Sequence, residues 1–356
     1  MYKQLKIKNF RCFRKLNFDK LARINLIAGK NNVGKTALLE AIFLHGGAYN
    51  PELAFRINAF RGMESFKVEY GTKVEAPWNS LFYQFNTREE IQIEGKDTNL
   101  DFLTVKLKEI IASEEFEKIF RFPEYRPLPT TLETLKVLKL IYEKNGEKGE
   151  YYLVIDPNGI RVLPFPPPPP FPTVFLGARM RIPFREEAER FGKLETYKKE
   201  ELLINALKII EPRLKRITLV VIGMEPILHG DIGMDRLVPL PLIGEGFHRL
   251  AGLVISIANA SGGVVLIDEI ENGLHYSVLK NVWKVIDKVS RKFKVQIFAT
   301  THSLECIAAA YEAFSEYEEE EFRFHRLEKD EGDTIDVITY DREALEGALE
   351  MGLEVR

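Results

Sequence analysis

One segment, Gly29-Lys-Asn-Asn-Val-Gly-Lys35-Thr36, constrains the fold of this chain more than any other. It matches the pattern G-x-x-x-x-G-K-[S/T], which forms a phosphate-binding loop when it joins a buried strand to a helix. Residues 24–28 form an apolar run typical of such a strand, and residues 36–44 are typical of the helix that should follow. The glycines let backbone N–H groups turn towards phosphate oxygens, and the helix N-terminus adds the positive end of its dipole. The sequence therefore predicts a nucleotide site.

The residue types of the loop indicate separate roles at this site. Lys35 is expected to reach the β- and γ-phosphates, and the hydroxyl of Thr36 is expected to ligate Mg²⁺. The nucleotide contacts predicted from the loop are Gly29, Lys30, Asn31, Asn32, Val33, Gly34, Lys35, Thr36 and Ala37.

A second apolar run, residues 263–267, ends in two carboxylates, Asp268 and Glu269. Ligands of open α/β sheets bind beyond the carboxyl ends of the strands, so both acids should face the phosphate loop. Asp268 is predicted to hold Mg²⁺ together with Thr36, and Glu269 to polarise the water that attacks the γ-phosphate. An acidic strand end that begins a solvated helix is the alternative, and it is the weaker one beside an intact phosphate loop.

A third strand-like run, residues 295–301, is followed by His302. A histidine after a strand is often only structural. Here a neutral imidazole at the end of a neighbouring strand can hydrogen-bond the γ-phosphate or the attacking water, and we therefore include His302 among the predicted catalytic residues.

Four segments together resemble the ABC-type ATPase heads of the SMC, RecF and OLD group: residues 5–13 (LKIKNFRCF), 29–36 (GKNNVGKT), 266–275 (LIDEIENGLH) and 299–303 (ATTHS). The stand-alone proteins called AAA family ATPases in bacteria and archaea are the nearest match. The resemblance implies an α/β P-loop fold with a mostly parallel central sheet, an antiparallel β lobe and a helical lobe. It also implies ATP as substrate and a head-to-tail homodimer that encloses ATP, in which a signature loop of one subunit completes the site of the other.

The chain departs from this family at the signature, where L-S-G-G-Q is replaced by residues 242–247, LIGEGF. Gly244, Glu245 and Gly246 are predicted to contact the γ-phosphate across the dimer through the helix that follows. A glycine-containing turn before a buried helix is the alternative. Arg179 and Arg181 follow another predicted strand and are candidates for stabilising phosphate charge, although loop arginines more often form surface ion pairs.

The predicted organisation has a head in two parts, an insertion and a short linker. The head comprises residues 1–50 and 173–356 and contains a helical lobe at 184–217; a β/α lobe is inserted at 51–163, and a polyproline linker occupies 164–172. In the insertion, short runs that include residues 80–85 look like strands, whereas 109–120 and 132–144 have helical spacing. The roughly 50 residues after His302 are too few for the Toprim nuclease domain of OLD proteins.

Composition predicts a cytoplasmic protein without a membrane segment. The chain has 356 residues, a formal net charge of −3, two cysteines and no apolar run long enough to cross a bilayer. The overall charge supplies no general attraction to nucleic acid. Basic residues do gather around one predicted helix and form what we call the basic cluster: Lys193, Lys198, Lys199, Lys208, Arg213, Lys215 and Arg216.

These features predict Mg²⁺-dependent ATP hydrolysis by a dimeric head that drives or gates a separately encoded effector. By family analogy that effector is a nuclease or a toxin in phage defence. Two alternatives remain: a RecF- or SMC-like DNA-repair clamp, for which DNA is a partner, and a sensor that binds ATP with little turnover.

Overall fold

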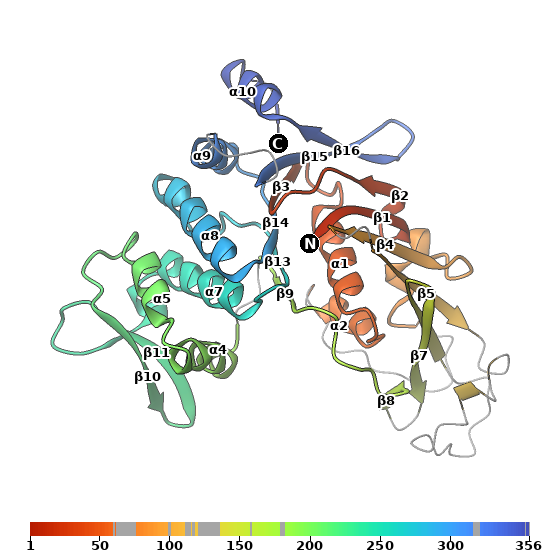
Figure 1. Cartoon of the computed structure of the whole chain (residues 1–356), viewed down its shortest axis with the longest axis horizontal. Coiled ribbons are helices and arrows are strands. Elements are labelled where there is room, and N and C mark those ends of the chain that lie inside the picture. The colour runs from red at the N-terminus through yellow and green to blue at the C-terminus, as the bar shows by residue number, and fades with distance from the viewer. Residues whose placement is uncertain are drawn as a thin grey trace.

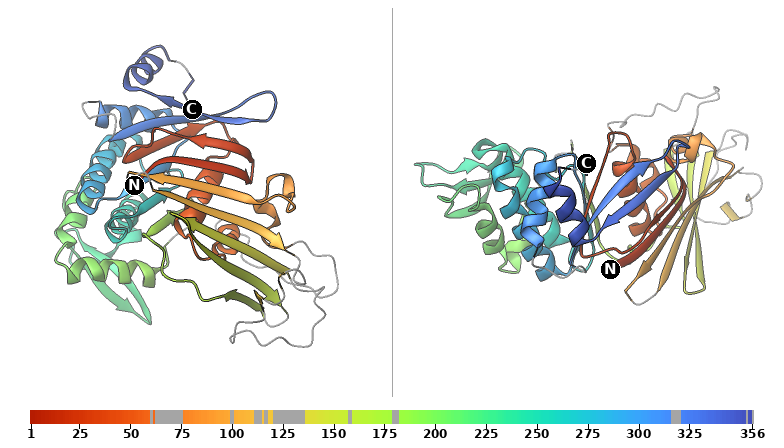
Figure 2. Two further views of the ribbon diagram at one scale, coloured as in Figure 1. Left: turned by 45° about the vertical axis from the view of Figure 1, so that its right-hand side comes forward. Right: turned by 90° about the horizontal axis from the view of Figure 1, so that it is seen from above.

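The computed structural model describes residues 1–59, 61, 76–98, 101–110, 115, 118–119, 136–156, 159–178, 182–315, 321–352 and 354–355. Within these residues the strands form three sheets (Figure 1). Seen from above, the layers follow one another as helices, central sheet, helix α1 and antiparallel sheet (Figure 2). The predicted α/β class is confirmed.

The central sheet has the strand order β16-β15-β3-β14-β13-β9. All pairs in it are parallel except β15 with the edge strand β16. Strands β3, β13 and β14 are buried at every position, as expected of parallel strands covered on both faces. The strands span β3 Ile24–Gly29, β9 Thr173–Leu176, β13 Val264–Ile267, β14 Gln296–Thr300, β15 Phe322–Lys329 and β16 Ile335–Tyr340.

A seven-stranded antiparallel sheet has the order β2-β1-β4-β5-β6-β7-β8. The sequence predicts a boundary between head and insertion at residue 50. Strand β1 precedes this residue and β4 follows it, and the two strands pair, so the sheet contains strands from both sides of the predicted boundary. The strands are β1 Tyr2–Phe10, β2 Phe13–Phe18, β4 Ile91–Asp97, β5 Phe102–Ile110, β6 Lys136–Lys144, β7 Glu147–Asp156 and β8 Gly159–Leu163.

Helix α1, Lys35–Gly46, lies between the two sheets. It contacts β3, β9, β13 and β14 on one side and β1, β4 and β5 on the other. A helix covered on two sides needs no exposed polar stripe, and ten of its twelve residues are buried, Lys35, Glu40 and His45 among them. The short helix α2, Leu53–Ala59, follows it and contacts it.

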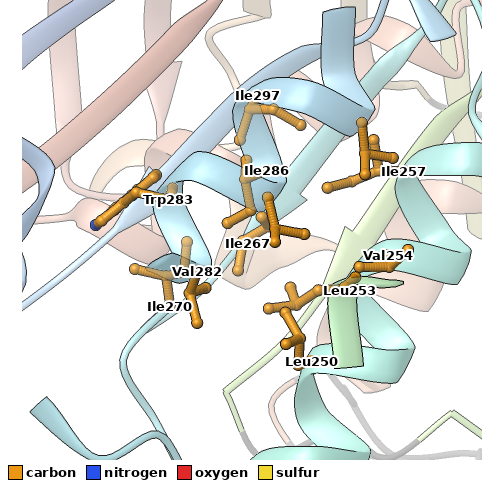
Figure 3. Packing of buried hydrophobic residues seen from close by; sticks show 14 of the residues in the cluster. Leu250, Leu253, Val254, Ile257, Ile267, Ile270, Val282, Trp283, Ile286 and Ile297 are labelled. Carbon is orange, nitrogen blue, oxygen red and sulfur yellow. The ribbon is translucent and has the colours of Figure 1, made fainter. Parts of the chain in front are cut away.

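Three helices cover the opposite face of the central sheet: α7 Glu245–Asn259, α8 Leu279–Phe293 and α9 Leu304–Phe314. Figure 3 shows the core between them and the sheet, where apolar side chains of α7 and α8 surround Ile267 of β13 and Ile297 of β14. Near the C-terminus, helix α10, Arg342–Glu350, contacts α9 and β16.

The predicted helical lobe contains two helices, α4 Phe184–Thr196 and α5 Glu200–Leu207. A small sheet and a short helix follow, with β10 Arg216–Ile222, β11 Glu225–Asp231, β12 Val238–Pro239 and α6 Leu240–Ile243. The basic cluster is therefore spread over α4, the connections before and after α5, and the start of β10. The polyproline stretch 164–172 leads from β8 back to β9, from one large sheet to the other. None of the helices in the described ranges is long and apolar enough to cross a membrane.

Two local expectations are wrong. Residues 136–144, expected in a helix, form strand β6, and residues 80–85, expected in a strand, form two 3₁₀ turns, η1 Asn79–Leu81 and η2 Tyr83–Phe85. The helix expected at 109–120 begins inside β5, and most of its remaining residues lie outside the described part of the chain.

Candidate functional site

The predicted phosphate loop joins the end of β3 to the start of α1. Gly29 and Gly34 have φ angles of 142° and 105°, which side-chain-bearing residues rarely adopt. A Cβ atom on Gly34 would lie 2.6 Å from Sγ of Cys12, and one on Gly29 would lie 2.6 Å from the carbonyl oxygen of Leu327. Both positions therefore require glycine for space as well as for backbone conformation.

Lys35 lies at the first position of α1 and is buried. Its Nζ donates to the carbonyl oxygens of Gly29 and Lys30, the latter at 3.0 Å, so the side chain folds back over its own loop. Burial lowers the pKa of Lys35 from its usual value to about 8, against the opposing influence of the Asp268, Glu269 and Glu271 carboxylates. An anion bound in the loop would raise the pKa of this amine again, because it favours the charged form.

Asp268 follows β13 directly and faces the loop. Its carboxylate accepts hydrogen bonds from Oγ1 of Thr36 at 3.1 Å and from Oγ1 of Thr300 at 2.7 Å. A hydroxyl and a carboxylate beside a phosphate loop are the oxygen donors that Mg²⁺ takes from proteins, with water and phosphate completing its shell. The described residues contain no cluster of three or more His, Cys, Asp or Glu side chains suited to a metal. Thr36 and Asp268 thus fit the predicted ion.

Glu269 and His302 meet across the ends of the adjacent strands β13 and β14. Nε2 of His302 lies 3.3 Å from Oε1 of Glu269, and both side chains are partly exposed. Glu269 has a φ of 48°, and its N–H donates to Oγ1 of Thr300 at 2.9 Å, which fixes the backbone of the turn. The backbone N–H of His302 donates to Oε1 of Glu271 at 2.7 Å. The structure therefore brings the two residues predicted to be catalytic into contact.

A cavity of about 530 Å³ opens beside the loop. Loop residues and His302 line part of it, and residues that the site prediction did not include line the rest: Arg11, Cys12, Arg61, Ser80, Phe82, Gln84 and Phe85. Arg11 and Arg61 both bind the fully buried carboxylate of Glu40, with their Nε atoms 3.0 and 2.6 Å from its oxygens. Arg11 belongs to the segment that carries the family resemblance, whereas no motif pointed to Arg61.

The predicted signature lies at the start of α7, apart from this cavity. Gly244 is the residue before the helix, and Gly246 packs so closely that a Cβ atom there would lie 2.7 Å from the carbonyl oxygen of Gly273. Among the described residues that line the cavity, none comes from 244–246, while Glu245 lines a separate cavity of about 430 Å³. Arg249, one turn further along α7, donates to the carbonyl oxygen of Asp268 at 3.2 Å and so links this helix to the strand end. Arg179 and Arg181 lie outside the described residues.

Comparisons with known proteins support this reading of the geometry. The model of the family described as "AAA domain, putative AbiEii toxin, Type IV TA system" matches residues 24–308. A Helicobacter pylori protein named ATP/GTP phosphatase is 27% identical over 341 residues, which cover 86% of each chain. An uncharacterized protein of Methanocaldococcus jannaschii is 36% identical over 108 residues, 30% of this chain and 47% of that protein.

Among solved structures, an Smc head bound to the C-winged helix domain of ScpA superposes with a TM-score of 0.50 at 12% identity, covering 98% of this chain and 99% of that one. The Pyrococcus furiosus Smc head with an extended coiled coil gives a TM-score of 0.50 at 11% identity and covers 98% of both chains. At such identities the likeness concerns the fold, and it confirms the expected head-type P-loop architecture.

Proposed function

Because the chain belongs to this AAA-domain family and is thus an ATPase of the ABC-type fold, we propose that it hydrolyses ATP with Mg²⁺ as a head-to-tail dimer. The observation that carries the proposal is that the start of α1 and the ends of β13 and β14 meet. Thr36 of α1 contacts Asp268 after β13, and His302 after β14 contacts Glu269. In the proposed site, Thr36 and Asp268 supply metal-binding oxygens, and Glu269 and His302 act as a general base and its partner beside the cationic loop.

In the proposed reaction, the loop and Lys35 hold the triphosphate, and Mg²⁺ supplies charge neutralisation on the β- and γ-phosphate oxygens when bound at Thr36 and Asp268. Glu269 accepts a proton from a water whose oxygen bonds to the γ-phosphorus. The bond from that phosphorus to the β–γ bridging oxygen breaks, and its electrons stay on the ADP oxygen. His302 holds the Glu269 side chain and the water in position, which assigns it a positioning role in addition to contact with phosphate.

For the cellular role, we propose that turnover drives or gates a separately encoded effector. The family description, which refers to a toxin and a type IV toxin–antitoxin system, supports a pairing with a second component and a role in phage defence. A DNA-repair clamp is the second candidate, favoured by the likeness to Smc heads. Both proposed roles, effector gating and DNA clamping, depend on the same nucleotide site.

The test compares two substitutions. Glu269→Gln removes the base but keeps the side-chain volume, so ATP binding should persist while phosphate release falls by about two orders of magnitude or more. Lys35→Ala should weaken ATP binding itself, and chelation of divalent metal should stop hydrolysis by the native protein. Binding is measured with a fluorescent ATP analogue and turnover by phosphate release. Near-native turnover of Glu269→Gln would assign the base to another residue and contradict the proposed mechanism.

A further inference from the structure

The segment that follows Trp78 projects one aromatic ring into solvent beside the nucleotide cavity. Phe85, the last residue of η2, is 62% exposed and lines the cavity together with Phe82 and Gln84. We propose that Phe85 is the stacking platform for the nucleobase, and that this site takes purine nucleoside triphosphates with little preference between adenine and guanine. This inference rests on the proposed function, because it assumes that the triphosphate occupies the loop.

The segment is fixed to the head at its base. Trp78 and Phe82 are fully buried, and Phe82 forms a bridge with Phe10 at the end of β1. The N–H of Arg11 donates to the carbonyl oxygen of Leu81 at 2.7 Å, and Nη1 of Arg11 donates to the carbonyl oxygen of Ser80 at 3.2 Å. A ring carried on so well anchored a turn has a defined position and needs little ordering when a ligand arrives.

The backbone at the tip is held in an unfavourable conformation. Gln84 and Phe85 have φ angles of 50° and 59°, in the left-handed region that large side chains avoid. Hydrogen bonds from the N–H of Phe85 to the carbonyl oxygen of Phe82 at 3.0 Å and from the N–H of Thr87 to that of Phe85 at 3.1 Å hold this turn. Such conformations persist where the surroundings impose them, and they concentrate at ligand sites. Here the consequence is an exposed ring at the cavity instead of a buried one.

The composition of the cavity divides it by chemistry. Asn31, Asn32, Lys35, Thr36 and His302 belong to the phosphate-binding part, whereas Phe82, Gln84 and Phe85 form an aromatic and amide surface. Its described lining includes the positively charged residues Arg11, Lys35 and Arg61 and no acidic residue, which suits a polyanion with a flat, uncharged base. The cavity volume of about 530 Å³ lies in the range of small-molecule sites.

Stacking explains why the base preference should be weak. Every purine offers the same kind of π-face to an aromatic ring, so stacking does not distinguish adenine from guanine. The amide of Gln84 has both a donor and an acceptor and can turn to meet either base edge. The name of the Helicobacter pylori relative, ATP/GTP phosphatase, describes dual use of this kind in that protein.

The experiment measures equilibrium binding of ATP, GTP and inorganic tripolyphosphate to the native protein and to Phe85→Ala. Loss of the stacking ring should weaken ATP and GTP binding equally, by about 10- to 100-fold, and leave tripolyphosphate binding unchanged. Phe165→Ala removes another exposed phenyl ring, 89% exposed in the polyproline stretch, and should change none of the three affinities. Circular dichroism melting of Phe85→Ala checks that the variant folds.

Phe85→Trp provides a direct signal. An indole at this position should restore binding, and its fluorescence should fall when ATP or GTP stacks on it but not when tripolyphosphate binds. The native Trp78 and Trp283 are both buried, so the native protein gives the background. Unchanged ATP affinity in folded Phe85→Ala, or an equal loss for tripolyphosphate, would overturn the proposal. Failure of the native protein to bind ATP at all, or native affinity in Lys35→Ala, would instead overturn the nucleotide site itself.

Discussion

At the scale of single residues, the site depends on side chains whose chemistry is set by burial. The strand ends bearing Asp268 and His302 were predictable because apolar runs ending in polar residues are a local pattern. Thr300, which donates to Asp268 and accepts from the N–H of Glu269, has no such signal, because threonine is common at the end of any strand. Phe85 could not be predicted either, since its position depends on the pairing of a distant turn with β1.

Lys35 gives the binding a pH dependence. With its pKa lowered to about 8, the free protein loses this charge as pH rises through that value, whereas bound phosphates favour the charged form. ATP affinity should therefore be constant from neutral pH to about 8 and then fall up to about tenfold for each further pH unit. Lys35→Arg, which keeps its charge, should bind with an affinity that does not change over this range. Fluorescence titrations from pH 7 to 9.5 measure both proteins, and parallel curves would contradict the role of Lys35.

The lowered pKa of Lys35 makes the stability of the fold change with pH in the opposite direction to ATP affinity. An unfolded chain keeps the lysine protonated up to its ordinary pKa near 10.5, so burial of the charged amine opposes folding below about pH 8. This cost decreases as pH rises from about 8 towards 10.5, in the range where nucleotide binding weakens.

At the scale of elements, sequence patterns predict a strand correctly where burial is the same along its whole length. Strands β3, β13 and β14 are buried throughout, and their apolar runs predict them correctly. The sequence of β6 does not show the alternation typical of a strand, because four successive positions are buried, and it therefore resembles a helix. Lys139 is buried in β6 because Glu115 and Glu150 bind its Nζ at 2.6 and 3.0 Å. A charged residue at this position of the sequence therefore does not indicate an exposed face.

Helix α7 gives a prediction about assembly. Gly246→Ala forces the start of the helix away from the carbonyl oxygen of Gly273, only 2.7 Å from the added carbon, and should displace the predicted signature. In a Glu269→Gln background, ATP should convert the protein to a dimer, and Gly246→Ala should remove this conversion while ATP binding remains. Gly252→Ala on the same helix meets only the end of the Ile182 side chain, at 3.6 Å, and is the control. Analytical ultracentrifugation measures the mass with and without ATP. If Gly246→Ala still forms the dimer with ATP, the predicted signature is not needed for dimerisation.

At the scale of the whole molecule, charge distinguishes the effector-gating function from the clamp. The net charge is −3, so DNA attraction must come from a local surface such as the basic cluster. Two of its members are already paired, Arg213 with Glu211 at 2.9 Å and Arg216 with Asp231 at 3.8 Å. The field of the basic cluster is reduced by these partners, which favours weak and salt-sensitive binding.

We therefore expect duplex DNA to leave the ATPase rate nearly unchanged at moderate salt. A clamp would instead show stimulation of about tenfold that falls steeply with salt. Lys198→Glu with Lys215→Glu would remove that stimulation, whereas Lys284→Glu with Lys288→Glu on α8, an equal change of charge, would not. Observing this set of results would promote the clamp over the effector-gating function.

The position of β3 has a consequence for biosynthesis. This strand carries the phosphate loop and is made early, yet its two neighbours in the sheet, β14 and β15, begin at Gln296 and Phe322. On the ribosome β3 therefore lacks both sheet neighbours until β14 and β15 have emerged, and pairings so distant in sequence form slowly. We therefore expect a nascent chain to bind ATP only after β14 has been synthesised, because β3 has neither of its sheet neighbours before then.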